Sequence, residues 1–433
     1  MRYYRPLRGV RVLSFEIVAS LPAATRTLGD LGADVVRIVS PKLGGPQLIS
    51  RLDGVASSKD TLFLDLQATV GLEIAKRMVP VADIVCNNFT PRVMRKFGLD
   101  YASLMALKSD IIALQLTGYG APGPWTDFPA YGPSIEAVAG MNASIGEDGD
   151  EPVKLGSDVF ADYASGRYAA LAMIAALERR RATGKGSYID VSMYESIVHL
   201  LGELASETSR SGRPHERLGN RDHHLAPQGI YPCLGENQWV AISVQNDEQW
   251  AAFRSELGYP ELVDPTLDNL DGRRQFHQRI DVVIGEWTAS RKKNNVAARL
   301  QSLGIPAGPV QDVQDLPVDP QLAHRQFFQM QHHREPILGY RAHPHMAVTA
   351  QAEGFRRALP KETRGDGGNN RRVLRRWLGL GTAEVRALEN LGALLPPRRS
   401  PFEDITGVFG TGGEVDPCFA QRLGLTKSDR RDE

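Results

Sequence analysis

The 433-residue sequence has little cysteine and no excess of charge of either sign. Its three cysteines, Cys86, Cys233 and Cys418, form no Cys-x-x-Cys pair, which argues against a disulfide framework or a zinc site and suits a reducing compartment. Fifty-one basic and 51 acidic residues cancel to a formal net charge of zero. The overall charge therefore gives no reason to expect nucleic acid or an anionic membrane as a partner.

Long apolar runs are also absent. No stretch approaches the length of a membrane span, and the first residues, Met1–Pro6, lack the apolar core of a signal peptide. Hydrophobic residues make up 42% and charged residues 24% of the chain, the proportions of a soluble globular protein. We therefore expect a cytoplasmic protein.

The common cofactor motifs are missing as well. The first predicted strand runs into Glu16–Pro22 without a Gly-x-Gly-x-x-Gly turn, and no Gly-x-x-x-x-Gly-Lys-Ser/Thr occurs, so we expect neither a nicotinamide cofactor nor a P-loop. There is no His-Glu-x-x-His. Histidines occur in adjacent pairs such as His223-His224, and neighbouring side chains on a strand point to opposite faces. We expect no metal.

Short apolar runs alternate with helical patterns in the first part of the chain. This alternation predicts an α/β fold with a mainly parallel sheet and right-handed crossovers. Strands are predicted at Val10–Phe15, Val35–Val39, Leu62–Leu66, Ile84–Cys86 and Ile111–Leu116, with helices at Ala23–Leu31, Val70–Val79 and Pro91–Phe97. The Gly/Pro-dense stretch Gly118–Pro133 is predicted to be loop.

The length predicts two or more domains. Residues 1–211 read as the first part of a large α/β domain, and residues 212–228 as a polar linker. A separate α+β module follows at residues 229–325, and residues 326–395 return to short strands and a closing helix. The tail, residues 396–433, has little to bury, and we expect part of it to be disordered.

Asp162 is the main candidate for chemistry. It stands just before the small-residue helix expected at Arg167–Leu177, where the helix dipole favours an ionised carboxylate. A carboxylate fixed there can attack an acyl carbon. The simpler interpretation is a helix N-cap, for which Asp is a favoured residue.

Motifs in a fixed order surround Asp162. They are, in chain order, Pro6–Leu13, Pro22–Arg37, Gly118–Trp125, Asp162-x-x-x-Gly166, Glu178–Gly186, Tyr188–Met193, Leu303–Val310 and Val373–Leu380. The series resembles the class III CoA-transferases, the family of the formyl-CoA and carnitine CoA-transferases, over residues 6–395. The resemblance implies that Asp162 carries the acyl group. It also implies a Rossmann-like large domain built from both chain ends, a smaller domain, and two subunits interlocked in a dimer.

The same resemblance implies which residues contact coenzyme A. They are Val18, Ala19, Ser40, Asn88, Phe89 and Lys96, with Arg37, Lys42, Lys59, Arg92 and Arg95 as further basic candidates for its phosphates. The expected substrate pocket contains Tyr131, Gly140, His223 and His224, and oxyanion donors are expected near Gly140 or Gly166. The chain departs from formyl-CoA transferase where Ala19 replaces a glutamine and Arg221–Pro227 replaces a glycine-rich loop.

These observations favour a homodimeric CoA-transferase that uses coenzyme A as substrate and no metal or redox cofactor. The first alternative is an α-methylacyl-CoA racemase, which needs a His and an Asp as its two bases. Racemases of this fold have a His-Asp dipeptide where this chain has Tyr131-Gly132. The second is a non-catalytic subunit that pairs with an active homologue. The donor acyl-CoA and the acceptor acid cannot be read from the sequence.

Overall fold

The computed structural model describes residues 2–40, 55, 57–147, 149–154, 160–213, 215–337, 340–346, 352–356 and 369–394. The chain divides into two compact units. Unit 1 comprises Met1–Asn142, Lys154–Gly212 and Pro317–Glu433, and unit 2 comprises Ala143–Val153 and Arg213–Leu316. Unit 2 thus contains most of the module expected at residues 229–325, together with the expected linker and a segment before Asp162. The expected disorder of the tail, residues 396–433, concerns residues outside the described ranges.

The centre of unit 1 is a six-stranded sheet in the order β4-β3-β2-β5-β6-β7, in which every pair is parallel. The strands are β2 (Arg11–Phe15), β3 (Asp34–Val39), β4 (Asp60–Phe63), β5 (Ile84–Asn87), β6 (Ile112–Thr117) and β7 (Ser187–Ser192). The side chains of β2 to β6 are largely buried because helices cover both faces, whereas in the edge strand β7 only Ser192 is buried. The predicted α/β fold with a parallel sheet is confirmed, and β7 is a strand that the sequence pattern did not predict.

The strand order defines where a ligand can enter. From β2 the chain builds outward to β3 and β4 on one side and then crosses to β5, β6 and β7 on the other. The connections that leave β2 and β5 therefore diverge at the carboxyl edge of the sheet. In open parallel sheets this divergence opens a crevice that holds ligands.

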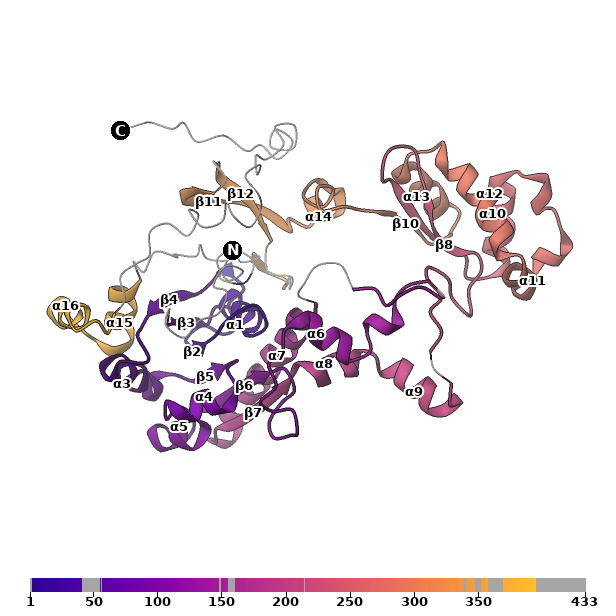
Figure 1. Cartoon of the computed structure of the whole chain (residues 1–433). Coiled ribbons are helices and arrows are strands. Elements are labelled where there is room, and N and C mark those ends of the chain that lie inside the picture. The colour runs from indigo at the N-terminus through magenta and orange to yellow at the C-terminus, as the bar shows by residue number, and fades with distance from the viewer. Residues whose placement is uncertain are drawn as a thin grey trace. The chain divides into compact units, whose positions relative to one another are not determined.

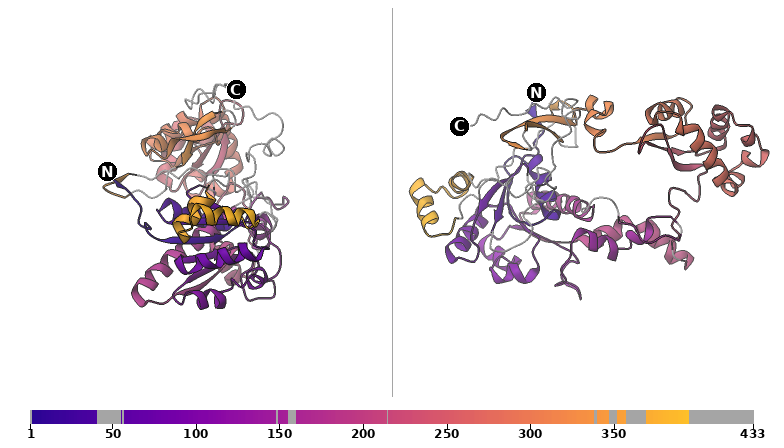
Figure 2. Two further views of the ribbon diagram at one scale, coloured as in Figure 1. Left: turned by 90° about the vertical axis from the view of Figure 1, so that its left-hand side faces the viewer. Right: turned by 45° about the horizontal axis from the view of Figure 1, so that its top comes forward.

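Helices pack on both faces of this sheet (Figures 1 and 2). On one face, α3 (Thr69–Met78), α4 (Pro91–Lys96) and α5 (Tyr101–Leu107) bury Met78, Met94 and Leu104 against strand residues such as Phe15. Elsewhere α1 (Ser20–Asp30) packs along α7 (Phe160–Thr183). The close approach needs Gly166, since a Cβ there would lie 2.7 Å from the Ser20 carbonyl oxygen.

The helix that carries Asp162 is longer than predicted. It begins at Phe160 rather than near Arg167, so Asp162 lies inside the first turn of α7 and does not precede the helix. The segment before α7 also contains α6 (Gly132–Val138), which begins at the end of the predicted loop. After β7 the chain forms α8 (Met193–Leu200) and α9 (Gly202–Ser211).

Residues from both ends of the chain build unit 1. In α15 (Asn370–Leu378), the Asn370 Oδ1 accepts a hydrogen bond from the Phe63 amide of β4 at 3.1 Å. After α16 (Thr382–Asn390), the Ala393 carbonyl accepts one from Asp65 at 3.1 Å. Strands β11 (Phe328–Ile337) and β12 (Tyr340–Met346) form a hairpin, and β1 (Arg2–Tyr3) pairs with β13 (Phe355–Arg356).

Unit 2 has its own core. An antiparallel sheet of β8 (Gln228–Pro232), β9 (Trp239–Ser243) and β10 (Ala307–Val310) packs against helices whose buried aromatic side chains are Trp250, Phe253 and Trp287. The helices are α10 (Asp247–Leu257), α11 (Leu270–Gln275), α12 (His277–Ala289) and α13 (Lys293–Ser302), and α14 (Pro320–His324) follows in unit 1.

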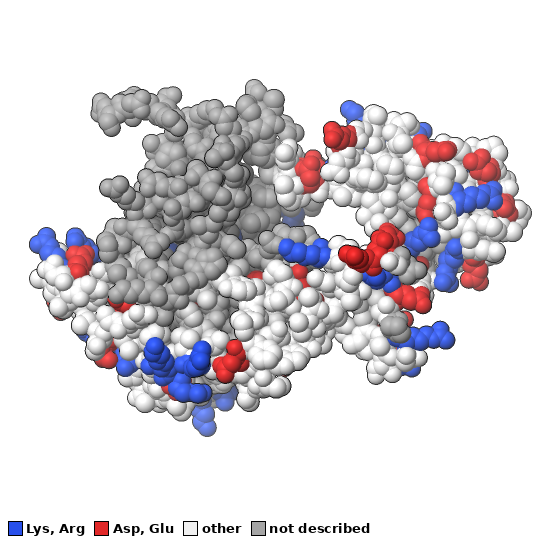
Figure 3. Space-filling view, viewed as in Figure 1, with Lys and Arg blue, Asp and Glu red and all other residues white. Residues whose placement is uncertain are grey.

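Across the described ranges, no helix combines the length and apolarity needed to cross a membrane. On the face in Figure 3, basic and acidic side chains are intermixed. The described residues also contain no group of three or more His, Cys, Asp or Glu side chains that could hold a metal ion.

Candidate active site

Asp162 lies where the starts of three helices meet. It is in the first turn of α7, with only 4% of its surface exposed. The backbone N–H groups of Ser20 and Gly132, the first residues of α1 and α6, lie close enough to its carboxylate to lower its pKa, as does its own N–H. The carboxylate is therefore removed from water yet held by amide donors.

The environment shifts the protonation of Asp162. Its pKa is raised from 3.8 to about 6, and burial is the largest cause. The Glu136 charge acts in the same direction, whereas hydrogen bonding from the Ser20 and Gly132 amides acts in the opposite direction. The carboxylate is thus ionised at neutral pH but is less stable in that form than an exposed aspartate.

Glu136 is the closest acidic partner of this site. It is fully buried in α6, and its Oε1 accepts a hydrogen bond from the Ala161 amide at 3.2 Å, one residue before Asp162. Its Oε2 is buried and has no hydrogen-bond partner within the part of the chain that the structure describes. Glu136 therefore holds the start of α7 and leaves one oxygen available beside the reactive carboxylate.

The connection between β2 and α1 forms another wall of the site. Val18 has the unusual φ of +57° for a β-branched residue. The Asn88 side chain holds Ile17, the residue before Val18, through two hydrogen bonds. The Ile17 N–H donates to Asn88 Oδ1 at 2.9 Å, and Asn88 Nδ2 donates to the Ile17 carbonyl at 2.8 Å. The same Nδ2 lies 3.4 Å from the Ser20 hydroxyl. Asn88 thus fixes the segment whose amide reaches Asp162.

The predicted CoA-contacting positions follow neighbouring strands at the carboxyl edge of the sheet. Val18 and Ala19 come after β2, Ser40 after β3, and Asn88 and Phe89 after β5. Ala19 and Ser40 are buried, and Ser40 Oγ accepts from the Leu66 amide at 3.3 Å. Lys96 ends α4 and is exposed. The structure contains no ligand, so contact between these residues and coenzyme A stays a prediction; Lys42 lies outside the described residues.

The predicted substrate-pocket residues belong to both units. Tyr131 directly precedes α6 in unit 1 and is 56% exposed. His223 and His224 are exposed in unit 2.

The expected oxyanion donors near Gly140 or Gly166 stay a prediction. In the structure the Gly140 amide donates to the Ala137 carbonyl at 3.1 Å, and Gly166 lies inside α7 as a spacer against α1. The Ser20 and Gly132 amides lower the pKa of Asp162 and are further candidates.

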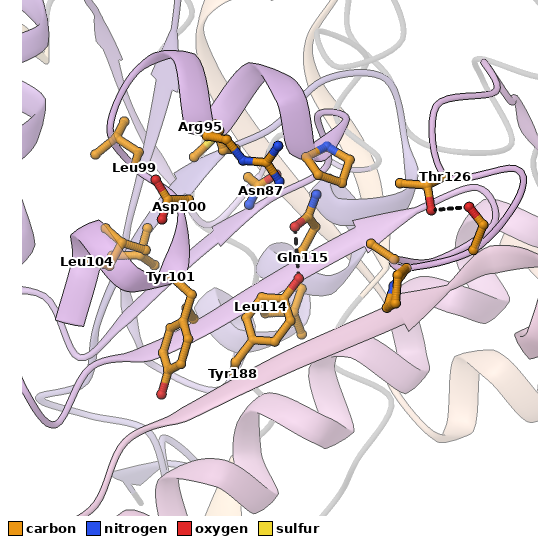
Figure 4. A pocket seen from close by; sticks show the side chains of 17 residues that line it. Asn87, Arg95, Leu99, Asp100, Tyr101, Leu104, Leu114, Gln115, Thr126 and Tyr188 are labelled. Atoms are coloured by element: carbon orange, nitrogen blue, oxygen red, sulfur yellow. Dashed lines mark hydrogen bonds between the residues drawn. The ribbon is translucent and has the colours of Figure 1, made fainter.

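A separate pocket of about 390 Å³ opens beside β5 and β6. Figure 4 shows Asn87 of β5, Arg95 of α4 and Gln115 of β6 converging on it. The Tyr188 hydroxyl donates a hydrogen bond to Gln115 Oε1 at 3.0 Å. Asp162 does not line this pocket. The pocket is therefore a neighbouring feature and not the place where the carboxylate would react.

The sequence analysis missed Ser20, Gly132 and Glu136. Backbone amides carry no signal of their own in a sequence, although Pro133 in the first turn of a helix is a recognisable start for α6. Glu136 could have been noticed as an acidic residue between Ile135 and Ala137 in an apolar stretch. Its nearness to Asp162 depends on how α6 packs against α7, which the sequence pattern does not contain.

The fold and the position of this buried carboxylate at the carboxyl edge of a parallel sheet can be compared with those of known families. The chain matches the model of CoA-transferase family III over residues 7–362 and belongs to that family.

Its relatives are CoA-transferases of organic acids. The chain is 29% identical to the succinyl-CoA–D-citramalate CoA-transferase of Chloroflexus aurantiacus, covering 74% of this chain and 82% of that protein. It is 31% identical to the β subunit of the succinyl-CoA–L-malate CoA-transferase of the same organism, over 72% and 79% of the two chains. The crystal structure of a CAIB/BAIF family protein from Brucella suis is 27% identical and matches with a TM-score of 0.76, covering 86% of this chain and all of that one.

Proposed function

We propose that the protein transfers coenzyme A from an acyl-CoA donor to a carboxylic acid acceptor, with Asp162 as the covalent nucleophile. The observation that carries this proposal is the geometry of Asp162: a buried carboxylate with a pKa of about 6 and backbone amides from Ser20 and Gly132 directed at it. Because it is ionised at neutral pH and largely shielded from water, it can attack a thioester carbonyl without first losing a proton.

The reaction proceeds through covalent intermediates in which every bond is accounted for. An Asp162 oxygen bonds to the donor acyl carbon, the C–S bond breaks, and the products are a mixed anhydride and CoA thiolate. The thiolate attacks the aspartyl carbonyl, which releases the donor acid as its carboxylate and leaves an aspartyl-CoA thioester. The acceptor carboxylate then attacks that carbonyl and expels the thiolate. Finally, the thiolate attacks the acceptor's acyl carbon and regenerates Asp162.

The amides near Asp162 support this sequence. Each attack on the aspartyl carbonyl places negative charge on an oxygen that originates from this carboxylate. Donors fixed at that oxygen stabilise the tetrahedral intermediate without having to reorganise. The Ser20 and Gly132 N–H groups already donate to the carboxylate in the resting structure, so we assign them this role.

The relatives suggest the class of substrate. The names of three of them contain succinyl-CoA together with citramalate, malate or glutarate. We propose a short acyl-CoA donor and a small dicarboxylic acid as acceptor. Coenzyme A would contact the positions after β2, β3 and β5, namely Val18, Ala19, Ser40, Asn88 and Phe89, with Lys96 near a phosphate.

Tyr131 weighs against a racemase. A racemase needs a second base opposite the aspartate to remove the α-proton. The position at which racemases of this fold have a histidine is Tyr131, which is exposed beside the start of α6. A phenol is a much weaker base than an imidazole near neutral pH. We therefore expect no exchange of the α-proton of a 2-methylacyl-CoA in deuterated water.

The experiment that tests the proposal combines a substitution with trapping. Wild-type enzyme incubated with succinyl-CoA and hydroxylamine should yield a hydroxamate at Asp162, detected by peptide mass mapping, and Asp162→Ala should yield none and lose all but a few per cent of CoA transfer. The rate should fall about tenfold per pH unit below a midpoint near 6, the pKa of Asp162. An active Asp162→Ala enzyme would refute the assignment.

We also propose that two subunits interlock as a homodimer, with a heteromer as the alternative. Support for the alternative comes from relatives named as the α and β subunits of one malate CoA-transferase. Light scattering of the purified chain, and activity of the chain alone, distinguish the two assemblies.

A further inference from the structure

A buried network of polar side chains joins the two ends of the β2–α1 connection. The Lys59 Nζ donates to Glu16 Oε1 at 2.6 Å, to Thr25 Oγ1 at 2.7 Å and to the Pro22 carbonyl at 2.8 Å. Glu16 directly follows β2, whereas Pro22 and Thr25 belong to the first turns of α1. An ammonium group has three protons, so the donors of Lys59 all serve to hold this connection.

Both carboxylate oxygens of Glu16 accept hydrogen bonds within this network. Glu16 Oε2 accepts hydrogen bonds from Ser14 Oγ at 2.7 Å and from Thr25 Oγ1 at 2.6 Å. The Lys59 and Glu16 side chains are 1% and 0% exposed. Removing one member of such a pair leaves the other as an uncompensated buried charge. The pair therefore constrains its surroundings far more than a surface ion pair does.

The residues that the network encloses form the β2–α1 wall of the active site. Between Glu16 and Pro22 lie Val18, with its φ of +57°, and Ser20. The Ser20 amide lowers the pKa of Asp162, and the Ser20 carbonyl oxygen lies against α7, 2.7 Å from where a Cβ on Gly166 would stand. A β-branched residue adopts a positive φ only where the surrounding structure enforces it. Asn88 fixes Ile17 within this segment, and Lys59 fixes the residues that flank it.

We propose that Lys59 and Glu16 are positioning residues for CoA transfer: together they hold the β2–α1 connection so that the Ser20 N–H is directed at Asp162. The inference rests on the proposed role of Asp162 as nucleophile. Neither side chain is assigned any contact with substrate; both act through the backbone of the connection. Arg37 and Cys86 also face the pair electrostatically and are left unchanged in the test.

Replacing Lys59 with methionine removes the three hydrogen bonds while keeping a side chain of similar length. The Ser20 amide then loses its fixed direction. Because its hydrogen bond lowers the pKa of Asp162, losing that bond moves the titration of Asp162 to higher pH, by about one unit. Misplacing the nucleophile and its donor by about 1 Å lowers kcat by roughly 10- to 100-fold.

Lys293→Met is the matched control. Lys293 is also buried, and its Nζ donates to Asp315 Oδ2 at 2.6 Å and to the Val310 carbonyl at 2.9 Å, but these residues belong to unit 2. The Lys293→Met substitution removes a buried lysine with the same kinds of partner, so it measures the effect of a general loss of stability. We expect Lys293→Met to titrate and turn over like wild type at temperatures where it is folded.

The decisive measurement is the titration of Asp162 in the substrate-free protein, by infrared difference spectra between each variant and the same variant carrying Asp162→Asn. We expect the pKa of Asp162 to be higher in Lys59→Met than in wild type and unchanged in Lys293→Met. The double variant E16Q/K59M should show the same pKa and kcat as Lys59→Met, because the pair acts as one unit. Glu16→Gln alone should shift the titration in the same direction and replaces Lys59→Met if that variant does not fold.

Two outcomes separate this inference from the function on which it rests. If the Asp162 titration and kcat of Lys59→Met, or of Glu16→Gln in its place, equal those of Lys293→Met, the positioning role is wrong even if wild type forms the hydroxamate. If wild type forms no hydroxamate, the nucleophile assignment is wrong, even where the titration shifts as expected.

Discussion

Replacing Asp162 with asparagine should stabilise the protein at neutral pH while abolishing turnover. Burial, reinforced by Glu136, raises the pKa of Asp162 in the folded state from 3.8 to about 6. The folded protein therefore binds this proton more tightly than the unfolded chain does, and this contribution to stability is lost as the pH rises from about 4 to about 6. A difference of about two pKa units corresponds to about 3 kcal/mol. Asparagine cannot ionise and avoids that cost.

The assay is urea unfolding of wild type and Asp162→Asn at pH 5 and pH 7.5, compared at constant m-value. The variant's stability relative to wild type should increase between the two pH values, by at most about 3 kcal/mol.

Asp100→Asn provides a control of opposite sign. Burial acts to raise the pKa of Asp100, but hydrogen bonds from the Ser103 hydroxyl and amide outweigh it and lower that pKa. This contribution to stability is complete above the unfolded-state pKa of 3.8 and is lost only as the pH falls below about 4. The stability difference between wild type and Asp100→Asn should therefore be nearly the same at pH 5 and pH 7.5. A difference between Asp162→Asn and wild type that is the same at both pH values would refute the description of Asp162 as a buried, destabilised carboxylate.

Three further outcomes follow from the same geometry. Gly166→Ala places a methyl group 2.7 Å from the Ser20 carbonyl oxygen. It should destabilise the protein by about 1–3 kcal/mol in urea unfolding and lower kcat at least tenfold. Gly285→Ala, with nothing within 4 Å of its Cβ, should neither destabilise the protein nor lower kcat. Glu136→Gln removes a charge that raises the pKa of Asp162, so the acid limb of the pH–rate profile should move to lower pH, and an upward or absent shift would contradict that cause. A dimer that persists at nanomolar concentration in light scattering is expected, and a monomer there would exclude the interlocked arrangement.

The sequence was most informative where local patterns determine structure. The five predicted strands occur within two or three residues of their predicted bounds, because buried parallel strands read as continuous apolar runs. Strand β7 was not recognised, since Ser187–Ser192 alternates polar and apolar residues at the edge of the sheet. The start of α7 was placed seven residues late because Asp162 was interpreted as preceding the helix, whereas it lies in the first turn.

The site itself was only partly accessible from the sequence. Asp162 could be singled out because a carboxylate near a helix start has a recognisable local signature. The donors to it could not, since Ser20 and Gly132 are 142 and 30 residues away along the chain and act through their backbones. The same applies to Lys59, which sequence reasoning considered only as a phosphate ligand. Its position within hydrogen-bonding distance of Glu16, 43 residues earlier, depends on how the segment before β4 folds beside α1, which no local sequence pattern contains.

The burial of Asp162 also has a consequence for the proposed covalent intermediates. An ionised carboxylate in this site is destabilised relative to a neutral group, by up to about 3 kcal/mol on the basis of its pKa. In the anhydride and in the aspartyl-CoA thioester the same side chain carries no charge. Acylation therefore relieves the burial penalty, whereas the amides of Ser20 and Gly132 remain available to stabilise charge when it returns to the oxygen during each attack. Glu136 adds to this effect because its nearby charge further disfavours the free carboxylate. The site thus brings the energies of the resting and acylated enzyme closer together, as an exchange reaction between two similar acids requires.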